Sequence, residues 1–405
     1  MVANGDNPPI RIIVPVYRDV DATRACLESL AASDLPANCT VAVYDDCSPE
    51  PEVSALCAEF CRERGWALTV NAENLGFVAT VNIGFDSSTS DVILLNSDTQ
   101  VHGDWVQRLG RCAYADDNTG TVTPFSNDAT ICSYPVFQAA NELPPGWTAA
   151  ALDGLFVRAN GGQRQVLPTA VGFCMYIRRD CLEDVGKFDE ENFGRGYGEE
   201  CDFSMRAVKQ GWSNQLAADV FVYHQGGASF QSESDDLKAQ ADSAMVRLHP
   251  EWGNLVEDFL IEDSLYPLRK NVDLQRLTER PADVEVVLSE QGRYARAILD
   301  RFARAEDVRR KETASLLEER ESLNAMLESS REQFRATDEA LRHADGVVAE
   351  LRTEYQRQAE ELEERRREAI AAADRAQHLE ARISLMENSR SWRYTAWLRR
   401  GEEDS

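Results

Sequence analysis

The sequence lacks any apolar run that could span a bilayer, which requires roughly 18 or more residues. Residues 1–9 have neither the basic stretch nor the apolar stretch of a secretory leader. Basic residues are scarce: 43 Lys and Arg stand against 70 Asp and Glu, for a formal net charge of -27. A surface this acidic repels phosphates. We therefore expect a cytoplasmic protein without a nucleic-acid partner.

Several common functional motifs are also missing. The ten cysteines include no CxxC pair, which argues against structural zinc and redox chemistry. Neither a P-loop nor a GxGxxG pattern occurs, which argues against kinases, NTPases and dehydrogenases. No glycine-rich loop bearing Arg and Lys follows the first predicted strand, which disfavours a sugar nucleotidyltransferase.

Proline is absent after Pro281 and glycine becomes rare, so the composition changes near residues 270–285. We predict three parts: a globular domain at 8–275, a coiled-coil helix at 285–388, and a basic, aromatic tail at 389–405. The tail contains two tryptophans, a tyrosine and four arginines. Such a segment suits either peripheral contact with the inner face of the cell membrane or docking onto a protein.

The second part has apolar residues at heptad spacing. Alternating steps of three and four residues form a seam that a single helix cannot bury, so we expect a homo-oligomeric coiled coil. A solvated charged helix without a partner is the alternative. The main series is Leu327, Phe334, Leu341, Val348, Tyr355, Leu362, Ala369, Ala376 and Ile383.

The first part alternates predicted strands and helices. Apolar, β-branched runs occur at 10–16, 40–44, 66–70 and 91–95, with helical patterns between them. This alternation predicts an α/β fold with a mostly parallel central sheet covered on both faces. Ligands of such sheets bind beyond the carboxyl ends of the strands.

Polar residues follow three of these strands and should meet at one edge of the sheet. A single acidic turn after a strand is usually a helix cap, but three converging sets indicate a site. Carboxylates without nearby thiolates favour a hard divalent cation, Mn or Mg. The three sets are Asp45 with Asp46, Asn74 with Gly76, and Asn96 with Asp98.

A second cluster lies downstream. A glycine-rich segment precedes Glu199, Glu200 and Asp202, which we expect in the first turn of a helix. Acids are favoured there by the helix dipole alone, but two adjacent glutamates are also a candidate general base. His224 follows a strand-like run, which supports a ligand role over that of an ordinary core histidine.

The ordered set of motifs between about residues 10 and 230 resembles the family 2 glycosyltransferases, inverting enzymes with the GT-A fold. It looks most like bacterial members that build surface polysaccharides, such as rhamnosyltransferase-like O-antigen enzymes. The matching segments are Ile12–Tyr17, Val43–Ser48, Asn74–Phe77 with Asn82 and Gly84, Leu94–Thr99, Gly172–Met175, Phe188–Asp189, Gly196–Glu200 with Asp202, and His224.

The resemblance implies a role for each matching position in binding a nucleotide-diphosphate sugar. Asp45 would contact the base with Asp46 close behind, and Pro15 and Tyr17 would line the nucleoside pocket. Asn74, Gly76 and Asn82 belong to the same donor-binding set. Asp98 and His224 would hold the divalent cation, with Asn96 where stricter members have an aspartate.

Glu200 is implied as the base, with Glu199 as its rival. The implied reaction moves a sugar to a hydroxyl of a glycan or lipid-linked acceptor with inversion. The alternative is a non-catalytic scaffold of a polysaccharide-assembly complex.

Overall fold

The computed structural model describes residues 8–226 and 234–389. Within them the chain divides into two compact units, Met1–Ala303 and Arg304–Ser405. The division falls later than the composition change at 270–285. Apart from Ser389, the predicted tail at 389–405 lies outside the described residues.

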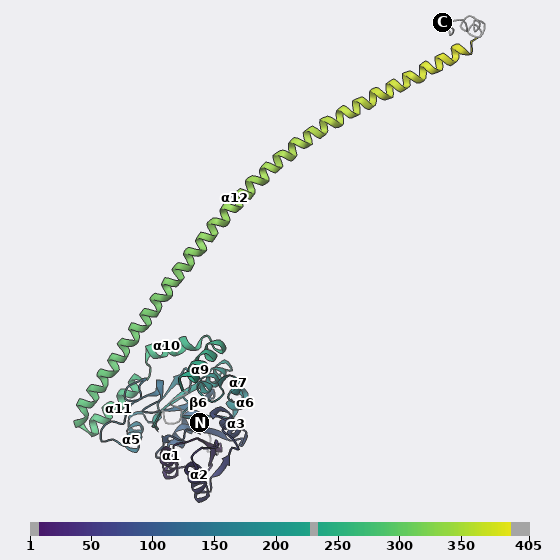
Figure 1. Cartoon of the computed structure of the whole chain (residues 1–405). Helices are drawn as coiled ribbons and strands as arrows, with labels where there is room; N and C mark the ends of the chain where they lie inside the picture. Colours follow the sequence, from purple (N-terminus) through teal and green to yellow (C-terminus); the bar gives the residue numbers. More distant parts are fainter. Residues whose placement is uncertain (1–7, 227–233, 390–405) are drawn as a thin grey trace. The chain divides into compact units, whose positions relative to one another are not determined.

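An eight-stranded mixed sheet forms the centre of the first unit (Figure 1). Its first four strands are parallel, as the sequence predicts, and a second parallel pair, β6 and β9, lies farther along. β8 and β7 run antiparallel to their neighbours. In spatial order the strands are β3 (Ala67–Val70), β2 (Cys39–Asp45), β1 (Ile10–Val16), β4 (Asp91–Leu95), β8 (Cys174–Ile177), β6 (Thr119–Phe125), β9 (Ser213–Phe221) and β7 (Arg164–Leu167).

Helices cover both faces of this sheet because successive side chains of a strand point to opposite faces. Ile12 and Val14 of β1 join one core, whereas Ile13 joins the other. The first core is covered by α1 (Val20–Ala32), α2 (Pro51–Arg64), α4 (Trp105–Ala113), α5 (Ala149–Asn160), α10 (Trp252–Glu262) and α11 (Tyr266–Glu279). The second is covered by α3 (Phe77–Asp86), α6 (Arg179–Val185), α7 (Glu190–Phe193), α8 (Glu199–Lys209) and α9 (Ser234–Leu248).

Residues 125–168, which look like a loop-rich insertion in the sequence, contain regular structure. They include the 3-10 turn Thr130–Cys132, helix α5 and strand β7. Phe156 of α5 is fully buried and stacks on Phe221 of β9 at 5.2 Å between ring centroids. The loop interpretation is therefore wrong for this part: α5 is a core helix that turn residues on either side of it obscure in the sequence.

The long helix α12 (Val284–Glu387) follows α11 and the 3-10 turn Pro281–Asp283. Its first turns belong to the globular unit: Val287 and Glu290 are buried there. Arg276 of α11 is fully buried and binds Asp283 and Glu290 at 2.8 and 2.7 Å. This ionic cluster joins the start of α12 to the core.

From Arg304 onward the described helix has no buried side chains of its own. The heptad residues are exposed, for example Leu341 at 61% and Leu362 at 72%. Surface ion pairs spaced three or four residues apart, such as Arg342 with Asp338, lie along it.

No helix among the described residues is both long and apolar enough to cross a membrane. The predicted fold class, an α/β domain with a mostly parallel sheet followed by a long helix, is confirmed.

Candidate active site

A cleft of about 620 Å³ opens where β1, β2 and β4 end and α8 begins. Its size lies in the usual range for small-molecule sites. The parallel strands bring their carboxyl ends to one edge, as expected from the sequence. Ten of the predicted site residues line this cleft: Pro15, Tyr17, Asp46, Asn74, Gly76, Asn96, Asp98, Glu199, Glu200 and His224.

Asp98 and His224 form a close pair, although 126 positions separate them in the sequence. A two-stranded antiparallel ribbon, β5 (Thr99–Gln100) with β10 (Tyr223–His224), pairs His224 with Thr99. His224 Nε2 lies 3.4 Å from Asp98 Oδ2. His224 Nδ1 lies 2.6 Å from the carbonyl oxygen of Asp128, so we assign the proton on Nδ1 to that bond. The Nε2 atom is then directed at Asp98.

The His224 ring is held in this orientation by its surroundings. It stacks on Phe173 at 5.3 Å between ring centroids, and its backbone N–H donates to Asn127 Oδ1 at 2.8 Å. Burial would lower the pKa of His224, but the hydrogen bond and charge of Asp98 outweigh it, and the pKa is raised. An imidazole so close to a carboxylate favours a positive charge at this point, whether a proton or a metal ion.

The residues present fit a hard divalent cation. The buried Oδ1 atom of Asn96 has no hydrogen-bond partner and, like Asp98 and His224, Asn96 lines the cleft. A carboxylate, an amide oxygen and an imidazole nitrogen are donors that Mn and Mg accept. No group of three or more His, Cys, Asp or Glu side chains in the described part could hold a metal by itself. A cation here would need oxygens from a bound ligand as well.

Glu199 and Glu200 are the first two residues of α8. Gly198 precedes them, has φ of +87° and offers no side chain to cap the helix. Glu199 is buried, and its Oε2 atom has no hydrogen-bond partner. Burial, followed by the charge of Glu200, raises the pKa of Glu199 well above its usual value. Of the two carboxyl groups, Glu199 is therefore the one whose pKa burial raises more strongly.

Glu200 is half-buried and lies next to Gly172, and both residues line the cleft. Burial also raises the pKa of Glu200, but hydrogen bonds from backbone groups, including those of Cys201 and Gly172, oppose the increase. Glu200 is thus the more readily ionised member of the pair. Two adjacent carboxyl groups with different environments suit a division of acid and base roles.

Asp45 does not line the cleft. It is fully buried, and its carboxylate accepts hydrogen bonds from the backbone N–H of Ser48, at 2.9 Å, and from the hydroxyl of Ser54. Asp45 is thus the last residue of β2, and its carboxylate binds the turn that leads to α2 and the first part of α2.

Asp46 lines the cleft and also shapes it. Its carboxylate accepts from Asn71 Nδ2 and from the backbone N–H groups of Leu75 and Gly76, each at 2.8 Å. These bonds fix the loop that carries Asn74. Gly76 has φ of +90°, and a Cβ there would lie 3.1 Å from Arg195 Cα, so only glycine fits easily.

Asn82 lies on α3, outside the cleft lining. Its amide bonds both backbone groups of Phe188, at 2.9 and 3.1 Å, and the carboxylate of Glu190 at 2.7 Å. It thereby holds the segment before α7. Gly84, on the same helix, packs against Ile13 rather than against a ligand.

Two arginines of the cleft lining, Arg18 and Arg195, were not predicted from the sequence. Arg195 lies on the glycine-rich segment before α8, is exposed, and donates to Asn74 Oδ1 at 2.8 Å. Arg18 follows β1, and its guanidinium lies over the Tyr17 ring at 5.0 Å from the centroid. In a chain with net charge -27, cations at a cleft could have been suspected only from their position after a strand or beside glycines.

Comparison with known proteins identifies the first half of this domain. Residues 11–186 match the family model described as Glycosyl transferase family 2. The chain is 22% identical over 219 residues to the Glycosyltransferase AglE of Haloferax volcanii and 27% identical over 182 residues to the Uncharacterized protein Mb1552 of Mycobacterium bovis. These matches cover 54% and 43% of this chain and 67% and 64% of the relatives, about two thirds of their length.

Two solved structures are similar to parts of this chain. The mannosyltransferase PcManGT of Pyrobaculum calidifontis, in complex with GDP-Man and Mn2+, has a TM-score of 0.46 and 15% identity, covering 73% of this chain and 84% of that one. GalNAc-T7 with UDP, GalNAc and Mn2+ has a TM-score of 0.47 and 12% identity, covering 69% and 58%. The family model ends before α8 and His224, so their roles depend on geometry. The match to Glycosyl transferase family 2 thus covers residues 11–186, a segment that contains the parallel strands β1, β2, β3 and β4 of the α/β fold.

Proposed function

We propose that the protein is an inverting glycosyltransferase that moves a sugar from a nucleotide-diphosphate donor to a hydroxyl of a glycan or lipid-linked acceptor in cell-surface polysaccharide synthesis. The observation that carries this proposal is the meeting of Asp98, His224 and Glu200 in one cleft within or beside a Glycosyl transferase family 2 domain. The relative from Haloferax volcanii, named a glycosyltransferase, supports it.

Glu200 is the proposed base. It is half-buried beside Glu199, whose pKa burial raises more strongly. No basic side chain of the described residues forms an ion pair with Glu200, so its carboxylate is available to accept a proton. Removing the proton of the acceptor hydroxyl strengthens that oxygen as a nucleophile for the anomeric carbon. A single in-line displacement inverts the anomeric centre, and the electron pair of the breaking bond leaves with the diphosphate.

The proposed donor site is the side of the cleft formed by residues that follow β1, β2 and β4. Pro15, Tyr17 and Asn74 would line the nucleoside pocket there, and Arg18 and Arg195 would offer positive charge to the diphosphate. Asp98, His224 and Asn96 would hold Mn or Mg. A divalent cation bound there would offset the negative charge that grows on the leaving diphosphate.

A thermal-shift screen of UDP-, GDP- and dTDP-sugars with Mn or Mg tests the proposal. A donor at 100 times its Kd stabilises the folded state by about 2.7 kcal/mol, so one nucleotide series should raise the Tm by several degrees. The matched variant Asp98→Ala should lose most of the shift. If no donor shifts the Tm and none releases its nucleotide diphosphate, the protein is not a glycosyltransferase and the scaffold alternative gains support.

We also propose that residues 304–387 assemble as a coiled coil with a second copy of this chain. The exposure of the heptad residues supports this: Phe334, Leu341 and Leu362 are 75%, 61% and 72% exposed on a helix that has no apolar partner among the described residues. Burying a large apolar side chain is worth about 1.5–3 kcal/mol. A row of such residues therefore favours association.

Light scattering with size-exclusion chromatography measures the oligomeric state directly. The double variant Leu341→Glu and Leu362→Glu should be monomeric where the wild type is not, because charge enters the seam. Ala349→Glu adds a charge beside the seam and should leave the oligomer intact. A monomeric wild type at micromolar concentration would contradict this proposal without touching the catalytic one.

A further inference from the structure

The first turn of α8 is poorly fixed by the residues that lead into it. Gly194, Gly196 and Gly198 all have positive φ, as does Tyr197 at +69°. Glycines supply no side chain to pack, and Gly198 gives α8 no capping bond. Yet Glu200 must be held within a fraction of an ångström to act on a substrate, because misplacement of about 1 Å can cost on the order of 100-fold in rate.

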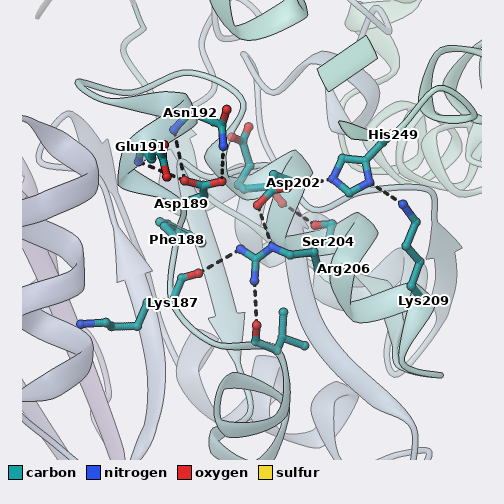
Figure 2. A network of polar contacts seen from close by, with 12 residues as sticks. Lys187, Phe188, Asp189, Glu191, Asn192, Asp202, Ser204, Arg206, Lys209 and His249 are labelled. Atoms are coloured by element: carbon teal, nitrogen blue, oxygen red, sulfur yellow. Dashed lines mark hydrogen bonds and ion pairs between the residues drawn. The ribbon is translucent and has the colours of Figure 1, made fainter. Parts of the chain in front are cut away.

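Asp202 supplies a fixed point two residues beyond Glu200. Its side chain is 3% exposed, and its two oxygens have different partners (Figure 2). Oδ2 accepts from Arg206 Nε at 2.7 Å, and Oδ1 accepts from His249 Nε2 at 2.8 Å. Residues two apart on a helix lie about 200° apart around its axis, since each residue turns by about 100°. Holding Asp202 inward therefore directs Glu200 outward, into the cleft.

The partners of Asp202 are themselves anchored. The guanidinium of Arg206 donates to the carbonyl oxygens of Val185 and Lys187, at 2.8 and 2.9 Å. These two residues lie just before Phe188, whose backbone Asn82 binds from α3. Helix α8, which carries the proposed base, is thus connected through Arg206 to α3, which begins directly after the loop with Asn74 and Gly76.

His249 anchors Asp202 from the other direction. Lys209 Nζ lies 2.8 Å from His249 Nδ1 (Figure 2). The same ammonium lies 3.1 Å from Glu251 Oε1. An ammonium can only donate, so we assign Nδ1 as the acceptor and Nε2 as the N–H that Asp202 receives. His249 follows α9 directly, and Ala241 of α9 would lie 3.3 Å from a Cβ at Gly198.

We propose that Asp202, with Arg206 and His249, is the positioning device for the base: this clamp sets the rotation of α8 so that Glu200 faces the reacting centre. None of the three side chains lines the cleft, so their effect is exerted through Glu200. This inference rests on the proposed glycosyl transfer. It predicts that loosening the clamp slows the chemical step while donor binding stays nearly unchanged.

The test compares Asp202→Asn with Asp283→Asn in the full chain, using the donor that gives the largest thermal shift and measuring release of its nucleotide diphosphate. Asp283 is a close match: it is also buried and accepts from an arginine Nε, at 2.8 Å, and from an aromatic N–H, Trp147 Nε1, at 2.6 Å. It lies outside the cleft lining. Both variants should lower the Tm by a similar few degrees.

Asp202→Asn should lower kcat about 10- to 100-fold with the donor KM within twofold, while Asp283→Asn should leave both nearly unchanged. His249→Phe should lower kcat in the same way, and His249→Gln, which keeps an N–H for Asp202, should recover most of it. The two His249 variants decide the matter if Asp202→Asn fails to fold.

Equal kcat for Asp202→Asn and Asp283→Asn, or for His249→Phe and His249→Gln, would overturn the positioning role. A wild type that releases no diphosphate from any donor would instead overturn the proposed function.

Discussion

Carboxyl groups are used differently on the two sides of the cleft. On the strand side, formed by residues that follow β1, β2 and β4, Asp46 accepts three hydrogen bonds of 2.8 Å from the loop it supports. On the helix side, at the start of α8, Glu199 has a buried oxygen without a partner. A carboxylate with hydrogen bonds to its oxygens shapes the site, whereas the buried Glu199, with an oxygen that has no partner, has a raised pKa.

The largest effect should come from the helix side. Glu200→Gln removes the proposed base but keeps the shape and the backbone hydrogen bonds, so kcat should fall by about 10²- to 10⁴-fold with unchanged donor affinity. Nucleotide-diphosphate release and calorimetry measure the two quantities. Glu199→Gln is the matched control and should retain most of the turnover. Normal turnover by Glu200→Gln would show that Glu200 is not the base. The proposed difference between the helix side and the strand side of the cleft would then no longer hold.

The strand side should instead govern donor binding. Asp98→Ala or His224→Ala removes a proposed cation ligand, and the donor affinity measured with Mn should fall roughly 10- to 100-fold. Calorimetry with Mn, and with EDTA in its place, separates the metal-dependent part. Asp86→Ala, an exposed carboxylate paired with Lys187, is the control and should bind donor normally. Unchanged affinity in Asp98→Ala would exclude the metal role.

Asp46 should matter first for stability. Asp46→Ala leaves the N–H groups of Leu75 and Gly76 and the amide of Asn71 without their acceptor, so the free energy of unfolding should fall by about 1–3 kcal/mol for each group that water cannot reach. Urea denaturation measures it. A loss below that of Asp86→Ala, whose surface pair is worth about 0–1 kcal/mol, would show that the strand-side carboxylate is not structural.

The smallest effect should be a gain. Because the folded state raises the pKa of Glu199 above its usual 4.5, the folded protein binds more protons than the unfolded one between these values. Stability therefore falls as pH rises from 4.5 towards the raised pKa. Glu199→Gln cannot ionise at this position, so its stability should not fall in this way. At the upper end of this pH range its free energy of unfolding should exceed that of the wild type by about 1 kcal/mol. Tm measured across pH would show parallel curves if Glu199 were instead satisfied.

Much of the strand side could be predicted from the sequence. The runs at 10–16, 40–44 and 91–95 form β1, β2 and β4, and the polar residues after them meet at one edge because the strands are parallel. Local patterns suffice for this, since strand order and chain direction fix where each strand ends. The side on which Asp45 lies could not be predicted, because two successive residues point to opposite faces and the sequence does not say which one faces the cleft.

Other features depended on contacts between distant segments. The ribbon of β5 and β10 that brings His224 to Asp98 has only two residues in each strand, too few for a recognisable pattern. The burial of α5 depends on distant strands and helices, and His249, one partner of Asp202, lies 47 positions away in the sequence. Such pairings leave no trace in local composition.

The sequence by itself determined the alternation of strands and helices, the acidic surface charge and the heptad spacing of the long helix, because each depends on neighbouring residues or on simple counts. Only the tertiary structure decided which carboxyl groups are satisfied and which are left unpaired beside the cleft. A side chain's pKa and reactivity depend on the burial and hydrogen bonds that distant residues supply, and these exist only once the chain has folded.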